Sequence, residues 1–183
     1  MNTKTRTPRL LSMLAAASLL ALAAPASAQT AHIAPVAFSE DFQTDLEDDY
    51  GLREGEYLSE RVTRAVSREL EERGVALGED GYAIEVTLVD ARPNKPTFQQ
   101  LGDRPGLDYA RSISTGGAEL SAVIRAPDGS VADEVTYRRF SSSLLDAQPI
   151  VSPWQDANRS INRFANRVAD AYGEAVANAP QGS

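Results

Sequence analysis

The sequence contains no cysteine, one histidine and one tryptophan. Without cysteine the chain forms no disulfide, carries no thiolate nucleophile and offers no sulfur ligand for zinc. Its one imidazole, on His32, also falls short of the paired histidines that zinc and haem sites commonly use. These absences exclude most metal and covalent chemistry, and we expect no cofactor and no metal site.

Motifs for nucleophilic catalysis and phosphate binding are also missing. There is no G-x-S-x-G turn, and residues 29–183 contain no S-x-x-K, since their only lysine is Lys95. The run STGG at Ser114–Gly117 precedes a predicted strand, whereas a phosphate loop precedes a helix. His32 is interpreted as a terminal strand residue, and we predict that the protein is not an enzyme. A carboxylate-dependent hydrolase stays open as an alternative, because that chemistry needs only two acids across a cleft.

The first 28 residues have the three parts of a secretory signal peptide. Lys4, Arg6 and Arg9 precede an apolar run from Leu10 to Ala24, and the small residues ASA end the segment. The run of 15 residues is shorter than the roughly 20 that cross a bilayer. We therefore expect cleavage near Ala28, a periplasmic or secreted location, and no transmembrane segment in the remaining chain. With no cysteine after that point, the lipid anchor of a bacterial lipoprotein cannot form.

The exported part of the chain is strongly acidic. The whole sequence has 18 basic and 26 acidic residues, and loss of three basic residues with the signal peptide moves the formal charge from −8 to −11. Such a charge repels a phosphate backbone, so we expect no nucleic-acid partner. The remaining length suits one domain, predicted at residues 29–177, followed by a disordered tail at 178–183.

Hydrophobic periodicity predicts the order strand, helix, strand, hairpin and helix. Alternating apolar and polar residues mark the strands, and apolar residues three and four apart mark the helices. A first helix of about 18 residues is expected to end at Arg73, because Gly74 provides a left-handed cap. The other predicted elements are strands at His32–Phe38 and Gly81–Ala91, a hairpin turning at Pro127–Gly129, and a helix whose capping box uses Ser152, Pro153 and Gln155.

These elements favour an α+β fold, a two-layer sandwich in which a small, mostly antiparallel sheet carries both helices on one face. In the last helix Trp154, Ile161 and Phe164 fall on one stripe that faces the core. The opposite face of the sheet is expected to meet water. The oligomeric state stays open, although that face or the edge near Pro35 can pair with a second copy.

The segment between the predicted strands, residues 92–116, is long for a connection inside a compact domain. We expect Arg111–Ser114 to extend the following strand. Two interpretations are open for the centre of the segment, and packing of Phe98 and Leu101 under the sheet edge is the favoured one. The alternative is a binding surface in which an aromatic ring lies among amide and charged groups: Lys95, Phe98, Gln99, Asp103 and Arg104.

Three arginines, Arg159, Arg163 and Arg167, follow one another at four-residue spacing on the polar side of the last predicted helix. Like charges at this spacing destabilise a helix by roughly 0.2–0.5 kcal/mol per pair unless something neutralises them. The favoured interpretation is a solvated face, partly neutralised by Asp156 and Asp170. The other is a binding surface for an anionic envelope component or an acidic envelope protein.

The stretch DLEDDYGLREGE, at Asp45–Glu56, places carboxylates where an EF-hand loop uses them to bind calcium. Its sixth position is Tyr50, where that loop needs glycine, and its ninth is Arg53, a cation facing the ion. We therefore interpret the stretch as a solvated approach to the first helix, whose positive N-terminal end favours nearby acids. A calcium-responsive protein is the less favoured alternative.

Four segments resemble a group of uncharacterised exported bacterial envelope proteins: DYGLREGEYL, VDARPNKPTFQQL, PGLDYARSISTGGAEL and WQDANRSINRFANRVA. The resemblance covers nearly all of the exported part of the chain. No activity is assigned to that group, so the resemblance implies no functional residue. Together with the missing catalytic motifs it favours a soluble binding or assembly module of the cell envelope, with an envelope protein or an anionic envelope component as partner.

Export can be tested on the mature N-terminus. Protein recovered from the periplasm or the medium should begin at or near Gln29, as measured by intact mass. Ala28→Arg should leave an uncleaved precursor, because the cleavage site requires a small residue. Thr44→Arg, far from that site, is the control and should be processed normally. A full-length chain that stays in the cytoplasm would contradict export.

Overall fold

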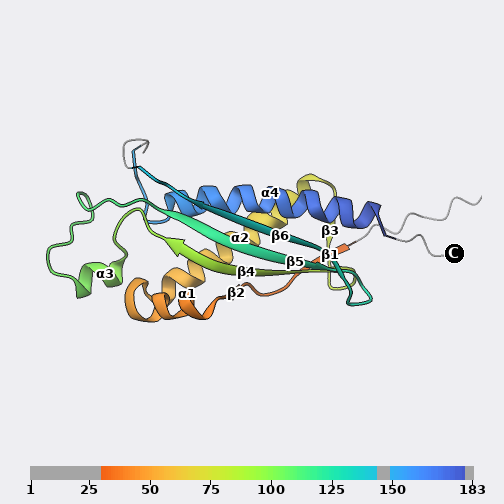
Figure 1. Ribbon diagram of the computed structural model, residues 1–183, viewed down its shortest axis with the longest axis horizontal. Helices are drawn as coiled ribbons and strands as arrows, with labels where there is room; N and C mark the ends of the chain where they lie inside the picture. The colour runs from red at the N-terminus through yellow and green to blue at the C-terminus, as the bar shows by residue number, and fades with distance from the viewer. Residues whose placement is uncertain (1–29, 144–148, 180–183) are drawn as a thin grey trace, which may run out of the picture.

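The computed structural model describes residues 30–143 and 149–179. The predicted signal peptide, residues 1–28, and most of the predicted tail lie outside the described residues. Asn178, at the start of that tail, forms the C-terminal cap of the last helix. Figure 1 shows a long twisted sheet, two long helices beside it and a smaller helical region at one end of the molecule.

The sheet has six strands, three long and three short. Its order is β3-β1-β4-β5-β6, and β2 also pairs with β4. The long strands pair antiparallel, β4 with β5 and β5 with β6, whereas the short strands run parallel to their neighbours. The strands are β1 (Thr30–Ile33), β2 (Ala37–Phe38), β3 (Ala76–Leu77), β4 (Tyr82–Arg92), β5 (Gly117–Arg125) and β6 (Val131–Phe140).

Two long helices supply most of the helical structure. They are α2 (Leu52–Glu72) and α4 (Gln155–Ala177), and the short segments are α1 (Glu40–Asp45), the π-helical turn η1 (Leu46–Tyr50) and α3 (Phe98–Asp103). None of the helices in residues 30–143 and 149–179 is both long and apolar enough to cross a membrane. The α+β fold class predicted from the sequence is confirmed.

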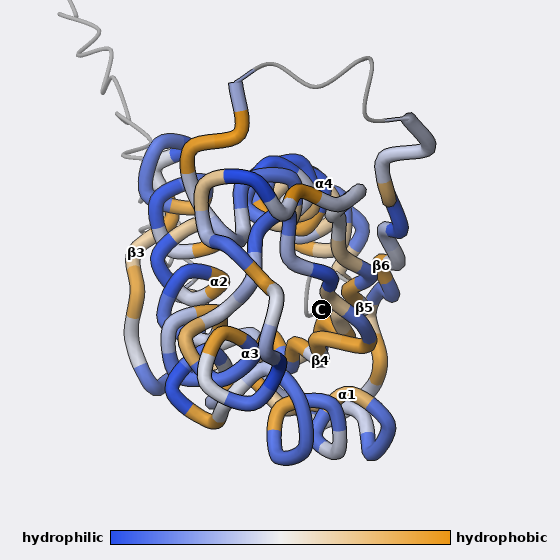
Figure 2. Tube along the Cα trace, turned by 90° about the vertical axis from the view of Figure 1, so that its left-hand side faces the viewer, coloured by the Kyte–Doolittle hydropathy of each residue, from blue (hydrophilic) through white to orange (hydrophobic). Residues whose placement is uncertain are grey.

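The core lies between the two long helices and one face of the sheet. Figure 2, turned from the view of Figure 1, shows α2 and α4 on the same side of β4, β5 and β6. The fully buried residues on that side of the strands include Ile84 and Leu88 of β4 and Leu120 and Ile124 of β5. The predicted stripe of the last helix is buried as a whole: Trp154, Ala157, Ile161, Phe164, Val168, Ala171 and Tyr172.

The other face of the sheet is polar. Arg125 of β5 pairs with Glu85 of β4 at 2.9 Å, and Arg138 of β6 pairs with Glu119 of β5 at 2.8 Å. All four side chains are at least one-third exposed, so each ion pair contributes little to stability. This solvated, charged face agrees with the prediction that only one side of the sheet is covered.

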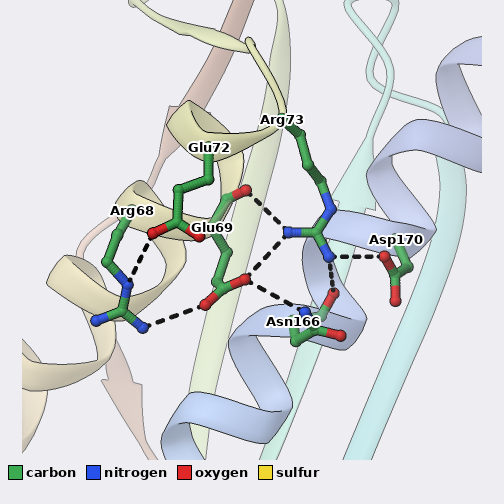
Figure 3. Close-up of polar contacts among 6 residues, drawn as sticks. All are labelled: Arg68, Glu69, Glu72, Arg73, Asn166 and Asp170. Atoms are coloured by element: carbon green, nitrogen blue, oxygen red, sulfur yellow. Dashed lines mark hydrogen bonds and ion pairs between the residues drawn. The ribbon is translucent and has the colours of Figure 1, made fainter.

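A polar network joins the C-terminal end of α2 to the middle of α4 (Figure 3). Arg73 donates to Glu69 at 3.1 Å and to Asp170 at 2.7 Å, and the amide of Asn166 donates to Glu69 at 3.3 Å. The hydrogen bond from Arg68, together with those from Arg73 and Asn166, holds the pKa of the Glu69 carboxyl below its usual range. Glu69 therefore lies in a structural contact between the two long helices.

Four details of the sequence prediction are wrong at the level of single elements. The strand predicted at His32–Phe38 is two strands, because Pro35 between them has no N–H to donate to β4. The first helix begins at Leu52, earlier than its apolar periodicity predicts. Arg111–Ser114 does not extend β5, which begins at Gly117.

The start of the last helix is the fourth difference. It begins at Gln155 with Trp154 as its N-cap, a residue whose side chain makes no capping hydrogen bond to the first turn. Gln155 instead accepts a hydrogen bond from the Val151 backbone at 3.0 Å. The expected capping box at Ser152 is therefore not formed, because residues 152–154 make a separate turn before the helix.

Two substitutions on α4 test the one-sided core. Phe164→Ala should lower the free energy of unfolding by about 3–5 kcal/mol, because removal of the buried ring leaves a cavity. Gly173→Ala, where an added methyl meets open space, should raise it by about 0.5–1 kcal/mol. Both values come from urea unfolding, and equal effects of the two substitutions would contradict the assigned faces of α4.

Candidate functional site

The segment between β4 and β5 is anchored at its base by Asn94, which is buried. Its side-chain amide donates to Asp156 at 2.7 Å and to the Ser114 carbonyl at 3.2 Å. Its carbonyl oxygen accepts from the Asp156 backbone N–H at 2.8 Å. Any side chain at Gly116 would collide with this amide, so the chain needs glycine there. The contacts tie the two ends of the segment to the start of α4.

Asp156 is the charged residue at the centre of the hydrogen bonds that anchor this segment. It also accepts from the Ser141 hydroxyl at 2.7 Å and pairs with Arg159 at 3.1 Å. Burial acts to raise the pKa of its carboxyl, but the hydrogen bonds from Asn94 and Ser141 and the Arg159 charge outweigh it and lower the pKa. These bonds favour the charged form of the carboxylate in the folded protein and fix its position.

The next part of the segment is the short helix α3. Thr97 and Gln100 form a complete capping box, in which each side chain bonds to the backbone N–H of the other residue. The Gln100 amide also donates to Asp49 of η1 at 2.8 Å, and Arg104 forms an ion pair with the same carboxylate. Gln99 donates to the Glu47 carbonyl at 3.2 Å. These bonds hold α3 against η1 in one orientation.

This well-bonded helix presents an exposed aromatic ring. Phe98 is 85% exposed, so the expectation that it packs under the sheet edge is wrong. Thr97 and Gln100 take the buried positions of the helix and turn Phe98 outward. Further large apolar residues of this region are also exposed, namely Leu52, Tyr109 and Ile113. We call the segment 93–116 the α3 loop; in Figure 1 it protrudes at the end of the molecule opposite the short strand β3.

The residues predicted for a binding surface on this loop do not form one cluster. Lys95 and Arg104 line a cavity of about 390 Å³ beside Asp49, and Lys95 also lies over the Tyr109 ring at 4.8 Å. Phe98, Gln99 and Asp103 lie outside that cavity. The sequence interpretation missed Asn94 and Gln100, although the spacing T-x-x-Q at residues 97–100 is a capping-box signal that it could have used. It expected Asp156 to neutralise the arginines of the last helix, as the ion pair with Arg159 confirms, but not to bind the base of this loop.

The three predicted arginines of α4 divide between different contacts. Arg159 is paired with Asp156, and Arg167 lies over the Tyr137 ring of β6 at 4.8 Å. Arg163 and Arg139 of β6 line two cavities, of about 700 and 510 Å³, along the border between β6 and α4. Among the described residues neither of these two has an acidic partner. We call this border the arginine groove; two of its guanidinium groups make no ion pair within the described residues.

The acidic stretch at Asp45–Glu56 is helical, and this conflicts with a calcium loop. The stretch crosses from the end of α1 through η1 into α2, and its carboxylates contact protein groups: Glu54 accepts from the Trp154 ring and Asp49 from Arg104. No group of three metal-binding side chains occurs within the described ranges.

Burial, with the nearby charges of Asp45 and Asp49, raises the pKa of the Tyr50 hydroxyl to about 12, which keeps it protonated.

At His32 and in the cavity of the α3 loop, the catalytic alternatives gain no support from the geometry. His32 lies exposed on β1, in register with Ala83. The cavity of the α3 loop contains a single carboxylate, Asp49, which already binds Arg104 and Gln100. It does not offer the two carboxyl groups that a hydrolase of this kind needs.

Comparison with known proteins gives no matching family model and no matching curated protein. Solved structures that resemble the chain include two bacterial proteins. Protein XCC0632 from Xanthomonas campestris, described as DUF330, is 14% identical, with 87% of this chain and 94% of that chain covered and a TM-score of 0.46. Rare lipoprotein B from Shewanella oneidensis is 11% identical, with 80% and 93% covered and a TM-score of 0.30. At these values neither similarity assigns a ligand or an activity.

The role of Asp156 can be tested by pH. Because its pKa is lower in the folded than in the unfolded chain, its stabilisation is present above the unfolded value of about 3.9 and is lost as the pH falls through the folded value. The difference in unfolding free energy between wild type and Asp156→Asn should thus be constant near neutrality and shrink in acid.

The measurement is urea unfolding of both proteins at a series of pH values. Asp103→Asn, on the exposed end of α3, is the matched control and should alter stability little at neutral pH. If the difference for Asp156→Asn does not change as acid is added, the carboxylate is not the charged centre described above.

Proposed function

We propose that this protein is an exported, non-catalytic binding module of the cell envelope, and that the α3 loop is its main contact surface for an envelope protein. The observation that carries the proposal is Phe98. An 85% exposed aromatic ring on a helix that the fold holds with a capping box and contacts to η1 has no role in the core. Exposed aromatic side chains held in one orientation are typical anchors of protein interfaces.

The surroundings of Phe98 also suit a protein partner. Leu52 at the start of α2 is 58% exposed and Ile113 in the same loop is 46% exposed, so the loop and the start of α2, which meets it at Gly51 and Gln99, carry further exposed apolar residues. Lys95 and Arg104 line the neighbouring cavity of the α3 loop and Asp103 is exposed at the end of α3, so the loop also carries charged groups of both signs. An apolar centre within a polar rim is the usual composition of a protein contact surface.

The arginine groove is the second proposed contact surface. Arg139 and Arg163 lie in it without an acidic partner among the residues that the structure describes, although the chain as a whole has an excess of acidic residues. Positive charge concentrated in a groove attracts an acidic group, and guanidinium groups bind carboxylates or phosphates in a fixed geometry. The groove is therefore assigned to an anionic group of a partner.

The α3 loop can be tested by crosslinking in intact cells. A photoreactive phenylalanine analogue at position 98 should give one discrete crosslinked product in the envelope fraction, because the ring enters the partner's surface. The matched control is the same analogue at Leu77, which is 41% exposed on β3 at the other end of the molecule. Irradiation is followed by electrophoresis and mass spectrometry of the product.

Phe98→Ala should leave the thermal melt unchanged, since the ring makes little contact with the core, and Phe98→Ala protein added in excess should fail to compete for the product. Equal crosslinking at positions 98 and 77, or none at 98, would refute the proposed role of the loop.

A further inference from the structure

β6 forms one edge of the sheet. It pairs with β5 on one side, and nothing in the described part of the chain pairs with its other side. A free edge of ten residues offers a row of backbone N–H and C=O groups to another strand. The charges along it are divided, with Asp133 and Glu134 in the first half and Arg138 and Arg139 in the second.

We propose that β6 pairs antiparallel with β6 of a second copy of this chain, about a two-fold axis at Thr136. Because the arrangement is symmetric, every contact across the axis forms twice. The residue pairs that face each other, from the ends toward the axis, are Asp133 with Arg139, Glu134 with Arg138, and Val135 with Tyr137. Opposite charges and apolar side chains directly across from each other are the pairs that stabilise antiparallel strands.

Other alignments lose these contacts. A shift of two residues in either direction leaves no charged residue of β6 opposite a residue of opposite charge. Parallel alignment places Arg138 beside Arg138 and Glu134 beside Glu134 of the second copy, and like charges directly opposite are destabilising. The charges at the edge therefore favour one register, and they also disfavour pairing with an unrelated strand.

The neighbouring helix has the same division of charge. Arg163 lines the cavity at the Arg139 end of β6, and Glu174 lines a cavity of about 460 Å³ at the Asp133 end. Neither Arg163 nor Glu174 forms an ion pair with any residue in the described segments. The pairing that places Arg139 opposite Asp133 of the second copy thus also directs the arginine groove toward Glu174 of the second copy.

The second copy therefore supplies the anionic group that the arginine groove takes in the proposed function, and the inference rests on that assignment. The border between β6 and α4 is acidic at one end and basic at the other in each molecule, so the ends of two antiparallel copies are complementary. Asp133 and Arg139 make no ion pair within the described chain, so exchanging them alters the contact between copies and leaves internal ion pairs intact.

The test is sedimentation equilibrium of the purified protein over a concentration series. Wild type should dimerise, and Arg139→Asp or Asp133→Arg should each raise the dissociation constant by about tenfold or more, because like charges then oppose each other across the axis. The double exchange, Asp133→Arg with Arg139→Asp, should restore the dimer. Thermal melts of all four proteins establish that each is folded.

Disulfide trapping gives a second measurement, since the chain has no cysteine of its own. Thr136→Cys lies opposite itself on the axis, within the reach of a disulfide between paired strands, and should form a covalent dimer on mild oxidation. Ala132→Cys, exposed on the same strand but away from the axis, is the matched control and should stay monomeric.

A monomeric wild type, a dimer that survives both single exchanges, a double exchange that stays monomeric, or equal trapping at positions 132 and 136 would each overturn the inference. Position 98 lies on α3, outside β6 and α4. A monomeric protein that still crosslinks through position 98 would therefore refute the dimer and leave the role of the α3 loop intact. Loss of crosslinking at position 98 in a protein that dimerises would refute the role of the α3 loop and leave the dimer intact.

Discussion

The packing of two apolar helix stripes against one face of the sheet is the constraint on which the rest of the structure depends. Leu58, Val62 and Leu70 of α2 and Ile161 and Phe164 of α4 are all fully buried against that face. Burying side chains of this size contributes roughly 1.5–3 kcal/mol each, far more than the exposed ion pairs of the open face. Since both helices lie on one side, the other sheet face stays open, and β6 keeps an edge with no strand partner within the described residues.

The α3 loop shows how this core supports a contact surface at its border. The base of the loop is a buried polar network, in which Asn94 and Asp156 satisfy each other's hydrogen bonds. A buried amide and a partly buried carboxylate are costly unless they are hydrogen-bonded, so their mutual bonding favours one defined conformation of this region. Above this base the capping box and the contacts of α3 with η1 hold an apolar ring, Phe98, outward. This arrangement suits the binding role proposed for the α3 loop. The arginine groove is a second, charged surface that is separate from it.

Predictions from the sequence were right for features that depend on local periodicity. They were wrong or missing where contacts between distant residues determine the structure. The stripe of α4 and the glycine cap at Gly74 are local signals, and the structure confirms both. The exposure of Phe98 depends on Gln100 bonding to Asp49, 51 positions earlier, and the loop base depends on Asn94 bonding to Asp156, 62 positions later. Hydrophobicity alone places a phenylalanine inside, and no local pattern reveals partners at such separations.

The central claim is that the fold holds the α3 loop in one conformation while it exposes Phe98. Hydrogen–deuterium exchange resolved to single amides tests it most directly, because exchange rates report local opening. The account predicts slow exchange at the Gln100, Leu101 and Arg104 amides, which bond to Thr97 and Gln100 within α3. The protection of these amides should fall when the core is destabilised. Exchange of these amides at the rate of an unstructured peptide, beside protected strands β4 and β5, would contradict it.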